Sequence, residues 1–210
     1  MRNLFIKQLG KGTKMMRMFL IFSFSQCLIS LTSCSEQTDT VEEFPDWKNT
    51  NVKYFEQEYQ KHVGIANAIL PKWSLPEDAT PSHTDCVLID VYESGEGTTS
   101  PYLNDSVKIH YVGYLLPSTS YPQGYDFDKS YKGAFDPESA VPYESLVSGF
   151  LPGFATALLR MHRGDYWQVT IPYQLGYGEE GSGSAIPGYS TLIFEVRLED
   201  FWSKKRGDRQ

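Results

Sequence analysis

The side chains that usually carry catalysis form no recognised constellation in this 210-residue chain. The four histidines have no metal-ligand spacing to one another or to a cysteine. No serine lies in a Gly-x-Ser-x-Gly turn. The glycine-rich run 176–183 lacks the lysine of a phosphate-binding loop, and its two glutamates would repel phosphate. We therefore expect no metal, no cofactor, and a chemistry that needs little acid or base. The histidines are His62, His83, His110 and His162.

Two aspartates, Asp126 and Asp128, flank Phe127 and resemble a carboxylate pair. In a strand, residues two apart share one face, so Phe127 would point the other way. We interpret the pair as a solvated edge or as turn contacts with the backbone rather than as an acid and a base.

Aromatic side chains remain as candidates for a site. Between residues 149 and 194, apolar and aromatic residues are separated by glycines and prolines. Taken singly, each aromatic residue is more often part of a core than of a site. Together they could line an apolar pocket. The set is Tyr111, Phe127, Tyr143, Phe150, Phe154, Tyr177 and Phe194.

The elements that would position these residues are mostly strands. Alternating apolar and polar residues predict strands over 87–91, 106–116, 141–146, 166–171 and 191–202. In the second, Tyr111 would face the core while Lys108 and His110 face water. Residues 153–161 form the one helix-like run of this part. About five strands and one short helix predict an α+β fold, an antiparallel sheet folded over the helix.

A second helix is predicted before the sheet. Val52, Phe55, Tyr59, Val63, Ala66 and Leu70 are spaced by three or four residues, which places them on one helix face. Pro71 would end this helix, and Gly64 could end it earlier. The face either packs on the following domain or serves as a dimerisation or partner surface, and we favour packing.

The first 33 residues predict an export signal, with a basic segment followed by an apolar run over 18–31. It ends in Leu31-Thr32-Ser33-Cys34, which resembles the bacterial lipobox. By that resemblance Cys34 would be a lipidated N-terminus, anchoring the protein in the bacterial cell envelope, where we expect the outer membrane. The other interpretation is an ordinary signal peptide with a chance cysteine.

Charge limits the partners. The signal holds five of the 19 basic residues and no acidic residue, which leaves 14 basic against 26 acidic groups and a net charge of −12. Such a surface repels phosphate backbones, so we expect no nucleic-acid binding. The predicted organisation is a lipoprotein signal over 1–33, a polar tether over 34–46, a helical extension and linker over 47–84, a folded domain over 85–203 and a polar tail over 204–210.

Residues 106–199 resemble the FKBP-type peptidyl-prolyl isomerases, the macrolide-binding immunophilins. Six segments carry the resemblance, in order along the chain. They are Val-Lys-Ile-His-Tyr-Val-Gly-Tyr-Leu at 107–115, Phe-Asp at 127–128, Gly-Phe-Leu-Pro-Gly-Phe at 149–154, Leu-Gly-Tyr-Gly at 175–178, Ile-Pro at 186–187 and Thr-Leu-Ile-Phe-Glu-Val at 191–196. The resemblance implies a strongly twisted half-barrel sheet wrapped over one short helix.

The family's pocket carries over by position. Tyr111, Phe127, Asp128, Leu151, Tyr177 and Phe194 would be catalytic residues, and Tyr143, Phe150, Phe154 and Ile186 would bind substrate. Phe154 stands where the family usually has the tryptophan of the pocket floor, and this smaller apolar floor bears on macrolide affinity more than on isomerase activity. The loop after Leu116 is longer than in compact members, and we expect its Tyr121 and Tyr125 to add a lip to the pocket.

The resemblance implies a peptidyl-prolyl cis-trans isomerase that assists folding of exported or envelope proteins and acts on proline-containing polypeptides. An alternative is a non-catalytic binding or chaperone module anchored to the envelope. A third possibility is an envelope assembly protein that dimerises through the helix at 51–70.

Overall fold

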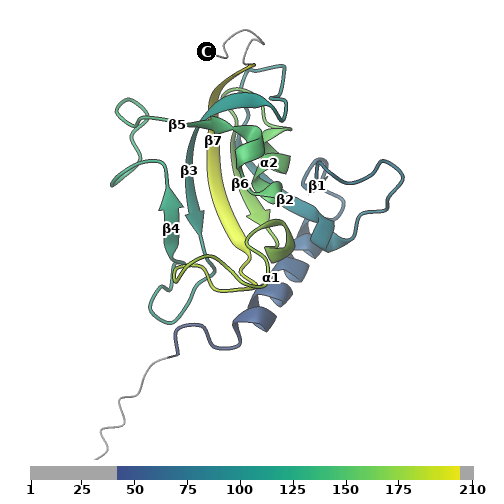
Figure 1. Cartoon of the computed structure of the whole chain (residues 1–210), viewed down its shortest axis with the longest axis vertical. Helices are drawn as coiled ribbons and strands as arrows, with labels where there is room; N and C mark the ends of the chain where they lie inside the picture. Colours follow the sequence, from purple (N-terminus) through teal and green to yellow (C-terminus); the bar gives the residue numbers. More distant parts are fainter. Residues whose placement is uncertain (1–41, 204–210) are drawn as a thin grey trace, which may run out of the picture. The chain divides into compact units, whose positions relative to one another are not determined.

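The computed structural model describes residues 42–203, shown in Figure 1. The predicted signal, Cys34, most of the tether and the tail over 204–210 lie outside the described residues. No helix within the described part is both long enough and apolar enough to span a membrane.

The fold is a seven-stranded sheet in which all paired strands are antiparallel. The order is β1 (Ile69–Pro71), β2 (Cys86–Glu93), β6 (Tyr166–Ile171), β7 (Leu192–Ser203), β3 (Asp105–Tyr114) and β4 (Asp126–Lys129), with β5 (Tyr143–Leu146) also paired to β3. The α+β class, the antiparallel sheet and the short covering helix are confirmed. The strand count exceeds the expected five because β1 and β4 are too short to show an alternating pattern.

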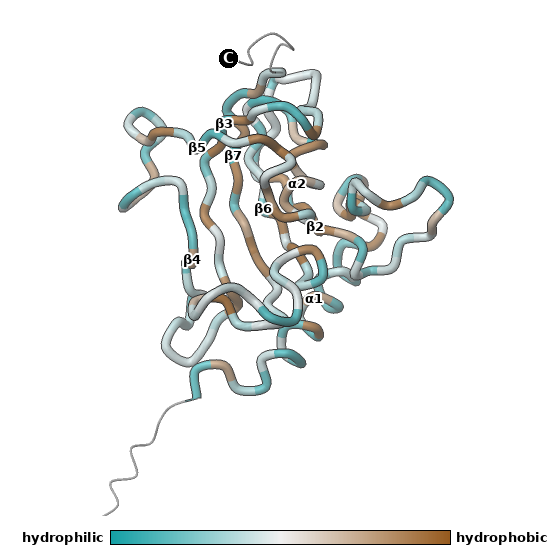
Figure 2. Tube along the Cα trace, viewed as in Figure 1, coloured by the Kyte–Doolittle hydropathy of each residue, from teal (hydrophilic) through white to brown (hydrophobic). Residues whose placement is uncertain are grey.

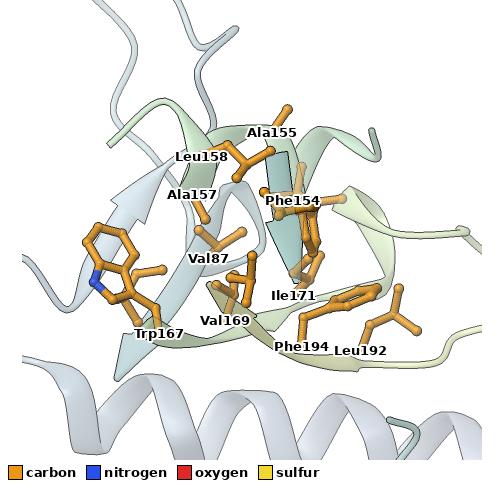
Figure 3. Close-up of a cluster of buried hydrophobic side chains, with 14 of the residues drawn as sticks. Val87, Phe154, Ala155, Ala157, Leu158, Trp167, Val169, Ile171, Leu192 and Phe194 are labelled. Carbon is orange, nitrogen blue, oxygen red and sulfur yellow. The ribbon is translucent and has the colours of Figure 1, made fainter. Parts of the chain in front are cut away.

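The short helix α2 (Pro152–Leu158) packs on the sheet, and apolar residues line the central strands that it covers (Figures 1 and 2). Pro152 occupies the first turn, where its missing N–H costs nothing. Every residue from Gly153 to Leu158 is buried. A Cβ on Gly153 would lie 2.4 Å from a methyl carbon of Ile171, so only glycine allows this approach. Figure 3 shows the resulting core, with Phe154 and Leu158 facing Val87, Val169 and Phe194.

Three 3₁₀ turns connect these elements: η1 (His83–Asp85), η2 (Val147–Gly149) and η3 (Tyr173–Leu175). Turn η2 leads directly into the start of α2, and η3 follows β6. Both therefore lie next to the residues on which the sequence places a pocket.

The N-terminal helix α1 (Trp47–His62) is displaced from the predicted span of 51–70. Gly64 adopts φ +86°, in the left-handed region, and the chain leaves the helix there. Of the two predicted ends, the one at Pro71 is wrong and the earlier one at Gly64 is confirmed: Val63 is exposed, and Ile69–Pro71 pairs with β2. The buried face is Trp47, Asn51, Phe55 and His62.

Helix α1 packs against the domain, as the favoured interpretation predicted. The Trp47 ring belongs to the main hydrophobic core, and its indole N–H donates to the Ser190 hydroxyl at 2.9 Å. At the other end of the helix, His62 Nε2 lies 3.2 Å from the Asp90 carboxylate on β2. The helix is thus held at both ends.

The outer face of β3 is covered, which corrects one prediction. His110 was expected to face water but is only 4% exposed. Phe135, in the segment after β4, packs against it with ring centroids 5.0 Å apart. A cavity of about 90 Å³ remains beside the imidazole, lined also by Tyr131, Tyr166 and Arg197. Period-two alternation separates the two faces of a strand, but it does not show which loop will cover either face.

Burial of His110 predicts a pH dependence of stability. Burial lowers the pKa of its imidazole, an effect that nearby Glu199 opposes and Arg197 reinforces. Glu195 also lines the adjoining cavity. Because the folded-state pKa is depressed, the unfolded chain binds more protons as pH falls below about 6.5, and the folded state loses stability over that range.

We expect His110→Phe, which keeps a ring against Phe135, to show a weaker loss of stability between pH 7.5 and 5 than the unmodified protein. Urea unfolding at several pH values measures the difference. If the free energy of unfolding falls equally with pH in the two proteins, His110 is not the source of the pH dependence.

Candidate functional site

An aromatic cavity of about 350 Å³ opens where the start of α2 meets β3, β7 and the loops beside them. Its lining comes from residues widely separated in the chain. They are Tyr111, Asp128, Tyr143, Gly149, Phe150, Leu151, Phe154, Tyr177 and Phe194. Eight of the ten family-derived site residues therefore lie around one cavity.

Phe154 forms the base of this cavity and is only 3% exposed. Its ring stacks on Phe150 at a centroid distance of 5.0 Å and meets the edge of Phe194 at 4.8 Å. Tyr111 lies 6.0 Å away, also edge to face. Aromatic pairs favour such offset and perpendicular contacts, so the rings hold one another in place. Phe154 is brought here because Pro152 starts α2 directly after Leu151.

Asp128 anchors Tyr111. The Tyr111 hydroxyl donates to Asp128 Oδ2 at 2.9 Å, across the pairing of β3 with β4. Burial first, and then the hydrogen bond to Asp128, raise the pKa of the Tyr111 phenol well above its ordinary value. The phenol therefore stays protonated at neutral pH, and the pair fixes a ring edge rather than supplying a base.

Two of the hydrogen-bond donors at the cavity that have no partner within residues 42–203 are the backbone N–H of Leu151, which immediately precedes α2, and the hydroxyl of Tyr177. Burial raises the pKa of the Tyr177 phenol, with Asp128 adding to the effect, so the phenol is a neutral donor. A carbonyl group bound in the cavity could accept from either.

Two family-derived residues do not line the cavity. Phe127 lies behind Phe194, with ring centroids 5.5 Å apart and nearly perpendicular planes. Ile186 is buried within the hydrophobic core. Phe127 therefore contacts a lining residue, and neither residue borders the open space. The resemblance placed both residues at the pocket, but the structure leaves Phe127 half-buried and Ile186 buried, outside the cavity lining.

The expected lip is also absent from the cavity lining. Tyr121 and Tyr125 pack on each other at 4.8 Å, and neither borders the cavity. Their loop is instead held by Glu43, whose side chain accepts hydrogen bonds from the Ser118 hydroxyl and the Ser120 N–H. Glu43 lies 75 residues before Ser118 in the chain, so local sequence patterns do not predict this contact.

Sequence reasoning missed two glycines at the site. Gly149 borders the cavity directly. Gly113, in β3, lies between two rings: a Cβ there would stand 2.6 Å from atoms of both Phe127 and Phe194. A lone glycine inside an otherwise apolar strand is the available signal, since it often marks a close approach. Among the described residues, no cluster of His, Cys, Asp or Glu could hold a metal ion.

Comparison with known proteins agrees with this arrangement. Residues 97–199 match the family model for FKBP-type peptidyl-prolyl cis-trans isomerase. The FKBP-type 22 kDa peptidyl-prolyl cis-trans isomerase of Escherichia coli is 41% identical over 108 residues, which is 51% of this chain and 46% of that protein. The FKBP-type isomerase FkpA of Buchnera aphidicola is 32% identical over 160 residues, 73% of this chain and 57% of that protein.

The fold agrees as well. The crystal structure of FkpA from Escherichia coli superposes with a TM-score of 0.53 at 26% identity, covering 74% of this chain and 61% of that one. The chain thus spans about half the length of the curated relatives it matches. The matched segment contains every residue that lines the aromatic cavity. Residues 97–199 therefore match the FKBP-type peptidyl-prolyl cis-trans isomerase family in sequence, and the fold around them matches that of FkpA.

Proposed function

We propose that this protein is a peptidyl-prolyl cis-trans isomerase that acts on proline-containing polypeptides. The observation that carries the proposal is the aromatic cavity over Phe154, bordered by two donors without protein partners. The match of residues 97–199 to the family model supports it.

The reaction requires no acid, base or metal. Rotation about an X–Pro bond faces a barrier of roughly 20 kcal/mol because amide resonance must be lost. The twisted amide of the transition state is less polar than the planar amide, so a dry aromatic cavity stabilises it preferentially. The residue types that line the cavity suit this task, since every side chain except Asp128 is apolar or aromatic.

Each part of the cavity has a proposed role. Phe154 lies under the proline ring, and Tyr111, Tyr143, Phe150 and Phe194 surround it. Phe127 supports the Phe194 wall from behind. The Leu151 N–H and the Tyr177 hydroxyl donate to carbonyl groups of the substrate, while Asp128 holds the Tyr111 ring. No covalent step or proton transfer is involved.

Tyr177→Phe tests the role of the hydroxyl. The ring and its packing stay, so we expect stability to change little and kcat/KM to fall about tenfold, the loss typical of one hydrogen bond. A protease-free isomerisation assay on a proline tetrapeptide measures it. An unchanged kcat/KM would remove Tyr177 from the mechanism.

A non-catalytic binding module is the second candidate, motivated by Phe154 at the position where the family usually has tryptophan. Under that alternative, a proline peptide binds the cavity but its isomerisation rate stays at the solvent background. The smaller floor also leads us to expect weaker macrolide binding than in members with tryptophan, because less apolar area is buried against the ligand.

The lipobox-like sequence before Cys34 leads us to propose a lipid-anchored protein of the bacterial cell envelope, with the isomerase domain beyond a polar tether. The clients would then be exported or envelope proteins. Metabolic labelling with a fatty-acid analogue tests this proposal: Cys34→Ser should abolish incorporation, and labelling that persists would exclude the anchor.

A further inference from the structure

The loop that carries Tyr177 is tightly folded on itself. Residues 178–181 lie against 186–189, joined by hydrogen bonds from the Tyr189 N–H to the Gly178 carbonyl and between Ser182 and Ile186. A Cβ on Gly188 would stand only 1.9 Å from the Glu179 carbonyl oxygen. The position of Tyr177 in the cavity therefore depends on the contacts that fix residues 178–181 and 186–189.

The turn of this loop contains an unfavourable backbone conformation. Tyr189 adopts φ +63°, in the left-handed region that bulky residues rarely occupy. Such a conformation persists only where the surroundings fix it. Its hydroxyl donates to Glu179 at 2.8 Å, and the Lys48 ammonium lies 4.0 Å from the centre of its ring. One of these contacts comes from α1, about 140 residues earlier in the chain.

The start of α1 fastens the residues that follow Tyr189. Asn51 is fully buried, and its side-chain oxygen accepts from the Thr191 N–H at 2.7 Å. The Thr191 hydroxyl donates to the main-chain carbonyl of Asn51 at 3.2 Å. Trp47 donates to the Ser190 hydroxyl, which in turn donates to the Pro187 carbonyl at 2.6 Å. These bonds join helix and loop in a region closed to water.

The residues just before α1 hold a second loop, between β3 and β4. Glu43 accepts from Ser118 and Ser120, and the Thr119 N–H donates to the Glu43 carbonyl at 3.5 Å. That loop leads into β4, which carries Asp128. Hydrogen bonding by Ser118 and Ser120 lowers the pKa of Glu43, so the contact keeps its charge at neutral pH. We call residues 43–51 the N-terminal strap.

We propose that the N-terminal strap positions the substrate pocket, and that Asn51 is the positioning residue for Tyr177. The path runs from Asn51 through Thr191 and Tyr189 to Gly178, the neighbour of Tyr177. The inference rests on the proposed isomerase function. It adds that the catalytic domain depends on a segment outside the residues that match the family.

The test compares Asn51→Ala with His62→Ala. Both remove buried polar contacts of α1, but those of His62 reach Glu58 and Asp90, far from the loop. For Asn51→Ala we expect amide hydrogen exchange within 176–191 to accelerate about tenfold or more, with exchange in β3 and β7 unchanged. We expect KM for a proline tetrapeptide to rise about threefold or more, with a smaller change in kcat.

A milder variant keeps the test decisive if Asn51→Ala does not fold. Trp47→Phe removes the donor to Ser190 and part of the indole's apolar surface while keeping one aromatic ring in the core, and it should accelerate loop exchange in the same direction. Unchanged loop exchange in the folded variants would overturn the proposal. Equal acceleration in His62→Ala would also overturn it, since the effect would then be general loosening. If the unmodified protein shows no isomerisation, the proposed function fails while hydrogen exchange still decides the role of the strap.

Discussion

Replacing Phe154 with alanine should lower kcat/KM about 10- to 100-fold, the largest effect expected at any single position of the cavity. The ring lies under the proposed proline site, and contact with a fully buried aromatic side chain contributes about 1.5–3 kcal/mol. The same change should reduce the free energy of unfolding by about 3–5 kcal/mol, because it leaves a hole between Phe150 and Phe194.

Leu158→Ala separates these two effects. Leu158 is buried in the same helix but does not border the cavity, so its truncation should destabilise the protein by about 2–5 kcal/mol. Below the melting temperature of both variants, we expect Leu158→Ala to retain most of its activity. If Leu158→Ala loses as much activity as Phe154→Ala, the loss reflects general destabilisation, and the floor role of Phe154 is contradicted.

Gly113→Ala should lower both the free energy of unfolding and kcat/KM without replacing any side chain that lines the cavity. The added methyl would lie 2.6 Å from atoms of Phe127 and Phe194, and both rings would have to move. Overpacking of this kind costs about 1–3 kcal/mol. Because Phe194 touches Phe154 at a centroid distance of 4.8 Å, its movement reaches the cavity floor, and we expect kcat/KM to fall about tenfold.

A second substitution tests the cause. Phe127→Leu removes the Phe127 ring atoms that the new methyl would meet and leaves the contact with Phe194, and Phe127 lies outside the cavity lining. In the Gly113→Ala background it should recover part of the lost stability, measured by urea unfolding, and part of the lost activity. Additive losses in the double variant would show that the glycine is required for another reason.

The predictable part of this fold is the part governed by local pattern. Alternation over 166–171 predicted the bounds of β6 correctly. The apolar residues Trp167, Val169 and Ile171 are buried on one face, while Tyr166 and Gln168 on the other face are partly exposed. The predicted helical run 153–161 locates α2, which begins one residue earlier at Pro152 and ends three residues earlier at Leu158. The cavity itself could be expected only from the family resemblance, since no periodicity distinguishes Phe154, which lines it, from Phe127, which does not.

The unpredicted features all depend on contacts between distant segments. His110 is buried because Phe135 packs against it, and β1 exists because Ile69–Pro71 finds an edge on β2. Asn51 reads as an ordinary polar position on a helix, yet it is fully buried because Thr191 and Trp47 satisfy its hydrogen bonds. Such pairings are settled by tertiary structure, which overrides local preference.

The most direct test of the central claim is exchange spectroscopy by NMR on a proline tetrapeptide at equilibrium. Uncatalysed interconversion takes tens to hundreds of seconds, too slow to give cis–trans exchange cross-peaks. Substoichiometric protein should produce these cross-peaks without changing the cis-to-trans ratio, and Phe154→Ala should largely remove them. Peptide resonances that shift on binding while exchange stays at the buffer rate would contradict catalysis and leave a binding module.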